Sequence, residues 1–350
     1  MMCVHRLAAM IVISTGVCAT HAADPPASQP AATQDSQRPQ SQDTKAARSA
    51  PGKIQLLRDV VYAQAPGRAG KLMDLKMDTA CLNSSEGKPR PAVVYIHGGG
   101  WKYGSKEMGL RASLALAHGG YFAVTINYRL TGDATYPAAV HDCKAAIRYL
   151  RAHAGELGID PDRIGVWGHS AGGHLAALLG TSGNSKALDG DVGPIDPSVS
   201  SVVQCVVDIS GPTDLSVDFS DGLISQWLGG PVNEHQDLAK QASPMTYIDA
   251  QDPPLLIIHG TDDPLVDMQR HSEAFHRVLK QAGVEVELLP VPNAGHVITT
   301  PSAYVKAAEF FDAHLGGKAA TAIAGVFEDQ AVRPTSIPQP PAQGASAPSP

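Results

Sequence analysis

Residues 163–180, with the sequence RIGVWGHSAGGHLAALLG, decide the fold of this chain. They begin with a short apolar run, pass through a glycine-rich turn and continue into a segment rich in Ala and Leu. A short apolar run bounded by glycine indicates a strand buried on both faces, and Ala and Leu favour a helix. The pattern therefore predicts a buried strand that turns sharply into a helix, with Ser170 at the turn.

Similar apolar runs recur along the chain and alternate with helix-like segments. Strand–helix alternation indicates parallel strands joined by crossovers. The chain is therefore predicted to be α/β: a mostly parallel, doubly wound sheet with helices on both faces and at most a small cap. We expect buried strands at 92–96, 122–126, 164–167, 202–209 and 255–258, and a last strand at 284–289. We also expect a leading antiparallel pair at 54–63 and 71–77, and helices at 137–153, 170–179, 264–281 and 304–315.

Composition divides the 350 residues into a folded body and two tails. The body, residues 53–317, has the length of one α/β domain. Residues 23–52 and 318–350 are rich in Ala, Pro, Gln and Ser, and we expect a disordered linker and a disordered tail because apolar burial cannot offset chain entropy there. Residues 211–253 interrupt the strand–helix rhythm, and they predict either a small cap over the strand ends or an ordinary long connection.

Residues 1–22 are interpreted as a signal peptide. His5 and Arg6 precede an apolar run at 7–19 that is too short to span a bilayer, and residues 20–22 (THA) form an imperfect cleavage site. The alternative is a retained anchor. We therefore expect an exported protein, periplasmic or extracellular, with no stable membrane span in the mature chain.

The overall composition argues against several classes of function. Hydrophobic residues make up 43% of the chain, as is usual for globular proteins, and the net charge of -7 is unlike that of a nucleic-acid-binding protein. Outside the predicted signal peptide the cysteines are Cys81, Cys143 and Cys205, whose odd number and wide spacing fit neither a disulfide framework nor a zinc site. We expect buried free thiols, with one bridge as the alternative, and no metal or cofactor.

Ser170 is the candidate nucleophile. It is the central residue of GHSAG at 168–172, and a G-x-S-x-G motif between a strand and a helix marks a nucleophile. The glycines leave room for a turn that lifts the serine hydroxyl above the sheet edge. The alternative is a glycine-rich turn without a chemical role.

The sequence HGGGW at 97–101 follows a predicted strand directly. Consecutive glycines allow backbone N–H groups to point into a cavity, and one such donor to an oxyanion contributes about 100- to 1000-fold in rate. We assign this role to Gly99 and Gly100, with the N–H of Ala171 as a third donor. No Walker lysine follows, which argues against a phosphate-binding loop, and His97 is expected to shape the loop.

Two further side chains, Trp101 and His169, are candidates for substrate contact. Trp101 follows the glycine loop, where packing beside the loop is the alternative role, and His169 precedes the nucleophile. A structural or pocket-wall role is the alternative for His169 and the interpretation for His174 and His259. His169 and His174 are separated by five positions rather than four, which disfavours a zinc site.

A serine hydroxyl needs an imidazole to accept its proton and a carboxylate to orient that imidazole. Asp263 follows the predicted strand at 255–258, and His296 lies in a loop after the last predicted strand. The order Ser170, Asp263, His296 is that of the α/β-hydrolases. The rival acids are Asp262, which a one-residue shift of the loop would favour, and Asp208 and Asp214.

Together these motifs resemble the α/β-hydrolase superfamily, and within it the carboxylesterase branch that groups feruloyl-esterase-like enzymes with relatives of the hormone-sensitive lipase family. The resemblance implies the α/β-hydrolase fold, the triad Ser170, Asp263 and His296, the oxyanion role of the glycine loop, and a structural role for Asp142 and for NYRL at 127–130. The matching segments are 97–106, 127–130, 136–151, 158–180, 242–248, 252–266 and 293–296.

The resemblance implies a serine carboxylesterase that hydrolyses short-chain acyl esters. The predicted signal peptide adds the expectation that the enzyme is secreted, which favours acetyl or feruloyl esters of carbohydrates as substrates. Its partner would be a small-molecule or carbohydrate ester and not a nucleic acid. Val297 and Ile298 follow His296 where the family often has Gly and an aromatic residue, which reshapes the acyl pocket. The alternatives are an amidase, formamidase or peptidase with the same triad, and a non-catalytic binding module.

Overall fold

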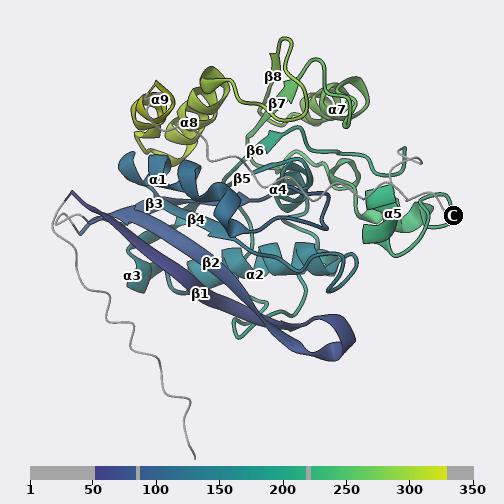
Figure 1. Ribbon diagram of the computed structural model, residues 1–350, viewed down its shortest axis with the longest axis horizontal. Coiled ribbons are helices and arrows are strands. Elements are labelled where there is room, and N and C mark those ends of the chain that lie inside the picture. Colours follow the sequence, from purple (N-terminus) through teal and green to yellow (C-terminus); the bar gives the residue numbers. More distant parts are fainter. Residues whose placement is uncertain (1–51, 84–86, 218–221, 329–350) are drawn as a thin grey trace, which may run out of the picture. The chain divides into compact units, whose positions relative to one another are not determined.

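The computed structural model describes residues 52–83, 87–217 and 222–328. These residues form an 8-stranded sheet with the order β1-β2-β4-β3-β5-β6-β7-β8. β1 pairs antiparallel with β2 and β2 antiparallel with β4, whereas all other neighbours are parallel. The predicted α/β architecture and its leading antiparallel pair are confirmed (Figure 1).

The predicted strands and most predicted helices are present, with ends that differ by a few residues. The strands are β1 (Ile54–Pro66), β2 (Leu72–Leu82), β3 (Arg90–Ile96), β4 (Phe122–Ile126), β5 (Ile159–His169), β6 (Cys205–Ile209), β7 (Leu255–Gly260) and β8 (Val286–Val291). The helices are α1 (Leu110–His118), α2 (Ala138–Ala152), α3 (Ala154–Leu157), α4 (Ala171–Thr181), α5 (Gly222–Leu228), α6 (Gln236–Gln241), α7 (Ala274–Ala282), α8 (Pro301–Leu315) and α9 (Ala319–Glu328).

Several of the described helices differ from the prediction, among them the short α3 and α6, which were not expected. The helix expected from 264 begins with a single π-helical turn, η5 (Gln269–Glu273), before α7, and it ends as expected at Gly283, whose φ is 87°. The helix α1 was not predicted. Its buried positions are mostly small, such as Ser113, Ala115 and Ala117, so the sequence lacks the large apolar stripe that marks a helix.

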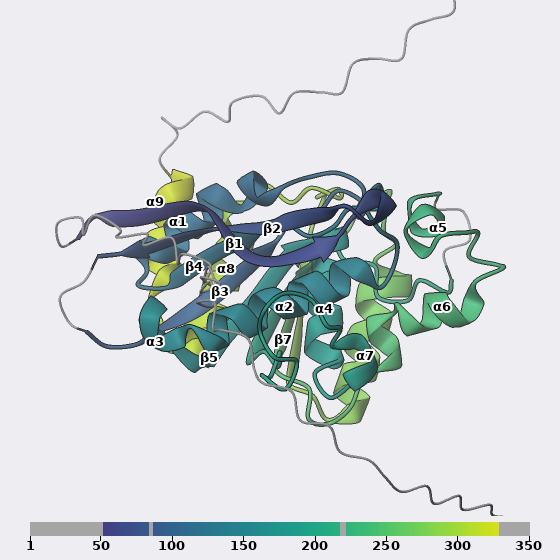
Figure 2. The ribbon, with the colours of Figure 1, turned by 90° about the horizontal axis from the view of Figure 1, so that it is seen from below.

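The sheet lies between two apolar layers because alternate residues of each strand face opposite sides. Figure 1 and Figure 2 show α1, α8 and α9 on one face and α2, α3, α4 and α7 on the other. In β7, Leu255 and Ile257 belong to the layer under α7, whereas Leu256 and Ile258 belong to the layer under α8. The sheet is therefore buried on both sides, as its apolar strands require.

The domain extends beyond the expected boundary at 317. α9 reaches Glu328, and its Ala319 and Ile323 are 0% and 1% exposed. The carboxylate of Asp312 accepts the N–H of Ala319 at 2.7 Å and so caps the start of α9, and a Cβ on Gly119 at the end of α1 would lie 2.3 Å from the Ala319 Cα. The predicted disordered tail is therefore wrong for residues 319–328, where small residues permit close packing of α9 on α1.

Several boundary predictions lie outside the described residues. They are the signal peptide at 1–22, the linker at 23–51 and the tail after residue 328.

The segment NYRL and α2 are joined by a buried ion pair. The guanidinium of Arg129 contacts both carboxylate oxygens of Asp142, at 2.6 Å from Nη2 to Oδ1 and 2.9 Å from Nε to Oδ2. Arg129 also donates to the carbonyl of Pro66 at the end of β1. A bidentate pair of this kind fixes orientation, which agrees with the structural role implied for Asp142.

The described cysteines are free thiols, as predicted. Cys143 and Cys205 are buried and Cys81 is partly buried. Burial raises the pKa of the Cys143 and Cys205 thiols well above the ordinary range. They are therefore unreactive apolar side chains of the core.

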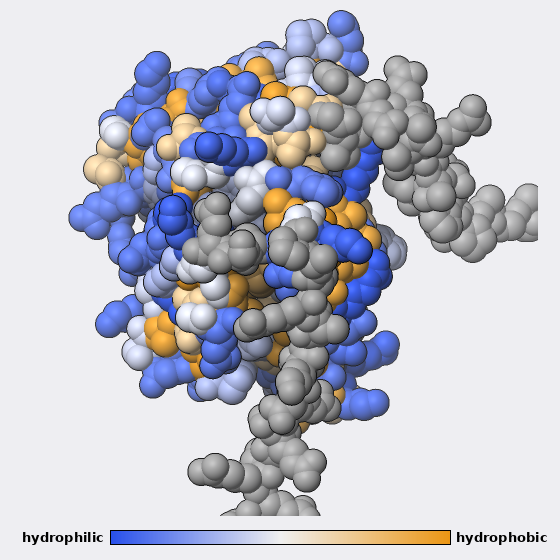
Figure 3. Space-filling model, turned by 90° about the vertical axis from the view of Figure 1, so that its left-hand side faces the viewer, coloured by the Kyte–Doolittle hydropathy of each residue, from blue (hydrophilic) through white to orange (hydrophobic). Residues whose placement is uncertain are grey.

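The surface carries both polar and apolar side chains. Figure 3 shows one face on which hydrophilic residues predominate and hydrophobic residues form small separate groups, which is normal for globular domains. Among the described helices, none has the length and hydropathy required of a membrane span.

The assignment of α9 to the domain can be tested with Ile323→Ala. Ile323 is 1% exposed, and truncating a buried isoleucine at the edge of a core should lower the free energy of unfolding by about 2 kcal/mol. Leu72→Ala is the control, because Leu72 is 63% exposed and its loss should change stability by less than about 0.5 kcal/mol. Urea denaturation measures both, and equal effects of the two variants would contradict the packing of α9.

Candidate active site

Ser170 occupies a strained turn between β5 and α4. Its φ of 58° and ψ of -123° lie outside the regions that side chains favour, at a cost of about 1–3 kcal/mol. A Cβ on Gly168 would lie 2.2 Å from the Gly172 carbonyl oxygen, and a Cβ on Gly172 would lie 2.0 Å from that of Ile96. Both glycines of the motif are therefore required by backbone contact, and the turn predicted from the sequence is present.

His296 lies between Ser170 and Asp263. Its Nε2 is 2.8 Å from the Ser170 Oγ, and its Nδ1 is 2.8 Å from the Asp263 Oδ2. Asp263 follows β7 and His296 follows β8, so neighbouring strands bring residues far apart in sequence to one edge of the sheet. With a proton on Nδ1, the imidazole is oriented to accept the serine proton at Nε2.

The carboxylate of Asp263 is enclosed by hydrogen-bond donors. Its side chain is 0% exposed, whereas that of His296 is 12% exposed. Oδ1 accepts the backbone N–H groups of Leu265 and Val266, and Oδ2 contacts His296 and His259. Burial by itself would raise the pKa of Asp263, but the hydrogen bonds outweigh it and hold the pKa well below its usual range. Asp263 therefore remains ionised at neutral pH.

The rival acids lie elsewhere in the described structure. The Asp262 carboxylate is exposed and accepts the Thr261 hydroxyl, and that of Asp214 accepts the Ser216 hydroxyl. Asp208 is buried in β6, where its Oδ1 accepts the Gly211 N–H. Among these described acids and Asp263, only Asp263 is hydrogen-bonded to His296.

The glycine loop lies against the nucleophile. A Cβ on Gly98 would lie 3.2 Å from the Ser170 Cβ. Gly99 and Gly100 have φ of 113° and 58°, which glycine adopts readily, and within the described residues their N–H groups donate to no backbone carbonyl. Ala171 begins α4, where the N–H has no partner within the helix. The oxyanion role of Gly99, Gly100 and Ala171 remains a prediction, and the position of the loop is compatible with it.

His97 shapes this loop, as expected. Its ring stacks on Tyr128 with 4.3 Å between ring centroids, and its Nδ1 is 2.8 Å from the Gly98 carbonyl oxygen. The Tyr128 hydroxyl donates to the His97 carbonyl at 2.9 Å. The first turn of the loop is thereby fixed to the segment after β4.

The far end of the loop is anchored by a buried lysine that the sequence analysis did not single out. The Nζ of Lys106 is 2.8 Å from Asp78, 2.8 Å from Glu107 and 3.2 Å from Asp59. Asp78 is 1% exposed and lies on β2. Asp59 and Asp78 are distant from Lys106 in sequence, and the neighbouring Glu107 is exposed. The sequence alone therefore does not show that these carboxylates surround Lys106.

Trp101 packs beside the glycine loop. It is 2% exposed, its ring stacks on Trp227 of α5 at 4.7 Å, and its indole N–H donates to the His174 Nδ1 at 3.2 Å. A contact with substrate remains a prediction for Trp101, whose φ is 55° and whose ring is stacked against α5. His174 is structural, as expected, and its Nε2 lies 2.7 Å from the Ala242 carbonyl oxygen.

His169 lies beside the candidate base. Its Nε2 is 2.8 Å from the carbonyl oxygen of His296, and the two rings are 5.0 Å apart. It is half-buried. A contact with substrate remains a prediction for His169.

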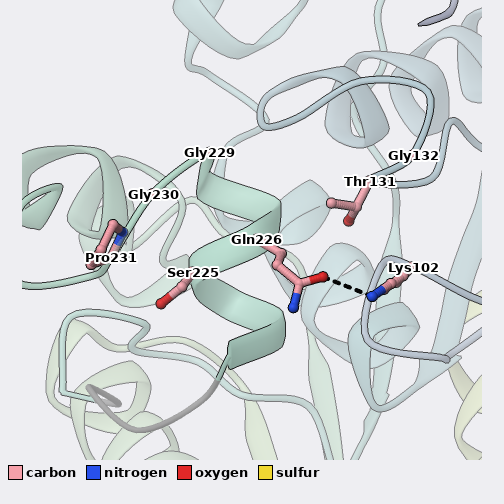
Figure 4. A pocket seen from close by; sticks show the side chains of 8 residues that line it. All are labelled: Lys102, Thr131, Gly132, Ser225, Gln226, Gly229, Gly230 and Pro231. Atoms are coloured by element: carbon pink, nitrogen blue, oxygen red, sulfur yellow. Dashed lines mark hydrogen bonds between the residues drawn. The ribbon is translucent and has the colours of Figure 1, made fainter.

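The interrupting segment 211–253 packs on the glycine loop through α5. A Cβ on Gly100 would lie 2.5 Å from the Leu223 side chain, and the Lys102 Nζ is 2.8 Å from the Gln226 Oε1 (Figure 4). This position supports a small cap rather than an ordinary connection. A surface hollow of about 470 Å³ lies beside this contact. It is lined by Lys102, Thr131, Gly132, Ser225, Gln226, Gly229, Gly230 and Pro231.

The fold and the strained serine turn define an α/β-hydrolase. The chain belongs to the BD-FAE family, whose model matches residues 77–279. This membership confirms the resemblance to the carboxylesterase branch.

The chain is similar to several esterases. It is 31% identical to esterase LipQ of Mycobacterium tuberculosis over 68% of this chain and 56% of LipQ. It thus spans little more than half the length of this curated relative.

Two solved structures share the fold. A truncated carbohydrate esterase from gut microbiota has a TM-score of 0.66 and 28% identity over 77% of this chain and 99% of its own. Esterase 2 of Thermogutta terrifontis with butyrate bound has a TM-score of 0.62 and 27% identity over 76% of this chain and 95% of its own.

The backbone contact at the serine turn can be tested with Gly172→Ala. The new methyl group would lie 2.0 Å from the Ile96 carbonyl oxygen, so β3 and α4 must separate, and we expect a loss of more than about 4 kcal/mol in the free energy of unfolding. Gly155→Ala is the matched control. A Cβ at Gly155 would meet no described heavy atom within 4 Å beyond its chain neighbours and its own helix. Alanine in a helix should therefore raise the free energy of unfolding by up to about 1 kcal/mol. Chemical denaturation with circular dichroism measures both, and a stable Gly172→Ala protein would contradict the contact.

The burial of Asp208 predicts that the wild type and Asp208→Asn differ in stability by an amount that depends on pH. Burial raises its pKa to about 6, and its Oδ2 has no hydrogen-bond partner among the described residues. The folded pKa exceeds the unfolded value of about 4, so the wild type loses stability as pH rises from about 4 to about 6. Asp208→Asn keeps the acceptor for Gly211 but cannot ionise. The stability of Asp208→Asn relative to the wild type should therefore increase as pH rises between about pH 4 and pH 7. A difference in the free energy of unfolding by urea that stays constant with pH would contradict this prediction.

Proposed function

We propose that this protein is a serine carboxylesterase in which Ser170 is the nucleophile, His296 the general base and Asp263 the acid that orients it. The observation that carries the proposal is the position of His296, with 2.8 Å to the Ser170 Oγ and 2.8 Å to the Asp263 Oδ2. Membership of the BD-FAE family and similarity to esterases support it.

In the proposed mechanism Ser170 attacks the ester carbonyl while His296 takes the hydroxyl proton. The developing oxyanion is held by the N–H groups of Gly99, Gly100 and Ala171. His296 then protonates the leaving alcohol, and the acyl group remains on Ser170. Water, activated by His296, releases the acid and restores the serine.

The proposed substrates are esters of short acyl groups. The space under the glycine loop is filled by Trp101 and Trp227, which are 2% and 0% exposed, and the loop itself contacts Leu223 of α5. The structure of the Thermogutta esterase with butyrate bound gives further support. These contacts support the proposal of a small acyl pocket.

The alcohol part is proposed to be a carbohydrate, which makes acetyl and feruloyl esters of carbohydrates the substrates to test first. The similarity to a carbohydrate esterase supports this class. We also propose export to the periplasm or the extracellular space, which rests on the signal-like residues 1–22. N-terminal sequencing of the protein expressed with its full N-terminus tests export, and an intact Met1 would contradict cleavage.

The proposed nucleophile can be tested with Ser170→Ala. The substrates are p-nitrophenyl acetate, butyrate and octanoate, methyl ferulate and an acetylated xylooligosaccharide. We expect turnover of the acetate and butyrate above that of the octanoate, and a loss of at least about 10⁴-fold in kcat for the variant. Ser302→Ala, at an exposed serine of α8, should retain full activity.

The alternatives give different outcomes in the same assay. Hydrolysis of the matching amides in preference to the esters would indicate an amidase or peptidase. A folded wild type that hydrolyses none of these substrates and does not react with a fluorophosphonate would contradict the esterase proposal and favour a binding module.

A further inference from the structure

A second histidine contacts the proposed triad acid from behind. His259 is the fifth residue of β7 and is 0% exposed. Its Nε2 is 3.1 Å from the Asp263 Oδ2, the same oxygen that the His296 Nδ1 approaches at 2.8 Å. One carboxylate oxygen therefore lies between two imidazoles.

The surroundings of His259 fix the position of its proton. Nε2 is also 2.9 Å from the Val266 carbonyl oxygen, so both atoms that it faces are acceptors. Nδ1 is 2.6 Å from the hydroxyl of Ser272, which is itself 0% exposed. The neutral ring thus carries its proton on Nε2 and accepts the Ser272 hydroxyl proton at Nδ1.

We propose that His259 is a positioning residue that holds Asp263 for His296, in a chain of side-chain contacts that begins at the buried Ser272 and runs through His259, Asp263 and His296 to Ser170. The proposal rests on the esterase function proposed above. His259 does not touch the reacting atoms, and its effect passes through the carboxylate.

Two effects follow from a shared carboxylate oxygen. The N–H of His259, together with the backbone N–H groups that Oδ1 accepts, restrains rotation of the carboxylate about its Cβ–Cγ bond, which keeps Oδ2 aligned with His296. It also draws part of the negative charge of Oδ2 away from His296. Without this donor, Asp263 would stabilise the His296 imidazolium more strongly and orient the ring less well.

Other titratable groups lie near this chain. Asp208 of β6 and His169 at the end of β5 both interact electrostatically with His259, and His271 of η5 interacts with Asp208. None of the hydrogen bonds between His259 and the described residues involves these groups. Removal of the His259 N–H therefore affects the position and charge of the Asp263 carboxylate more directly than it affects Asp208, His169 or His271.

The test uses His259→Phe and His259→Gln in the full chain. Phenylalanine keeps a planar ring but cannot donate to Asp263, whereas the amide of glutamine can. Ser272→Ala removes only the partner of Nδ1 and provides a second route to the result if His259→Phe does not fold. His153→Phe is the control, because His153 follows α2 and contacts Tyr149 away from the candidate triad.

The first measurement is the pH profile of ester hydrolysis. For His259→Phe we expect a decrease in kcat of about 10- to 100-fold, an unchanged KM and a shift of the acidic limb of kcat/KM to higher pH. His259→Gln should restore most of kcat, and Ser272→Ala should show a smaller change in the same direction. An unchanged pH profile in folded His259→Phe and Ser272→Ala, or a failure of His259→Gln to restore kcat, would overturn the proposal.

The second measurement is independent of turnover. An NMR titration of histidine-labelled protein, with His296 assigned by His296→Gln, should show the His296 pKa raised in His259→Phe and unchanged in His153→Phe. If the wild type hydrolysed no ester, this titration would still test the coupling. An unchanged His296 titration in His259→Phe would overturn the role of His259 without bearing on the esterase function.

Discussion

The contact between the backbone of β3 and the start of α4 is the constraint on which the rest of the site depends. No side chain fits between Gly172 and the Ile96 carbonyl, since a Cβ there would lie 2.0 Å from that oxygen. This contact holds one side of the turn at Ser170. On the other side, toward β6, the N–H of Ser170 donates to the Ile209 carbonyl, and the two restraints together keep Ser170 in its strained conformation. The candidate nucleophile and the glycine loop are thus positioned by main-chain packing, which side-chain motion does not disturb.

Around this turn, polar groups hold each part of the site from a different layer of the fold. The glycine loop is fixed at its start by His97 against Tyr128 and at its end by Lys106 among carboxylates. The acid is held by backbone N–H groups and by His259. The side chains of His97, Lys106 and His259 are buried, where hydrogen bonds are strong and an unpaired group is costly. The candidate site is therefore preorganised before a substrate arrives, which is the condition for electrostatic stabilisation of a transition state.

Much of the fold could be predicted because its signals are local. Apolar runs gave the strands, and glycine spacing gave the turn at Ser170. The prediction failed where the signal was weak or misleading. α1 buries mostly small residues, and α9 lies in a segment whose neighbours are rich in proline. The ring stack of Trp101 could not be predicted for another reason. Its partner Trp227 is 126 positions away, and nothing in the local sequence indicates the contact.

The sequence by itself determined the strand–helix order, the nucleophile candidate and the chain order of the acid and base, because glycine sterics and strand periodicity act between near neighbours. The tertiary structure decided which acid lies beside His296, since Asp262 and Asp263 differ only in the direction in which a loop presents them. It also decided that His259 shares the oxygen of Asp263, and that Lys106 anchors the glycine loop. These are contacts between elements that the sheet brings together, and the distance between two elements is set by packing of the whole core rather than by any short stretch of residues.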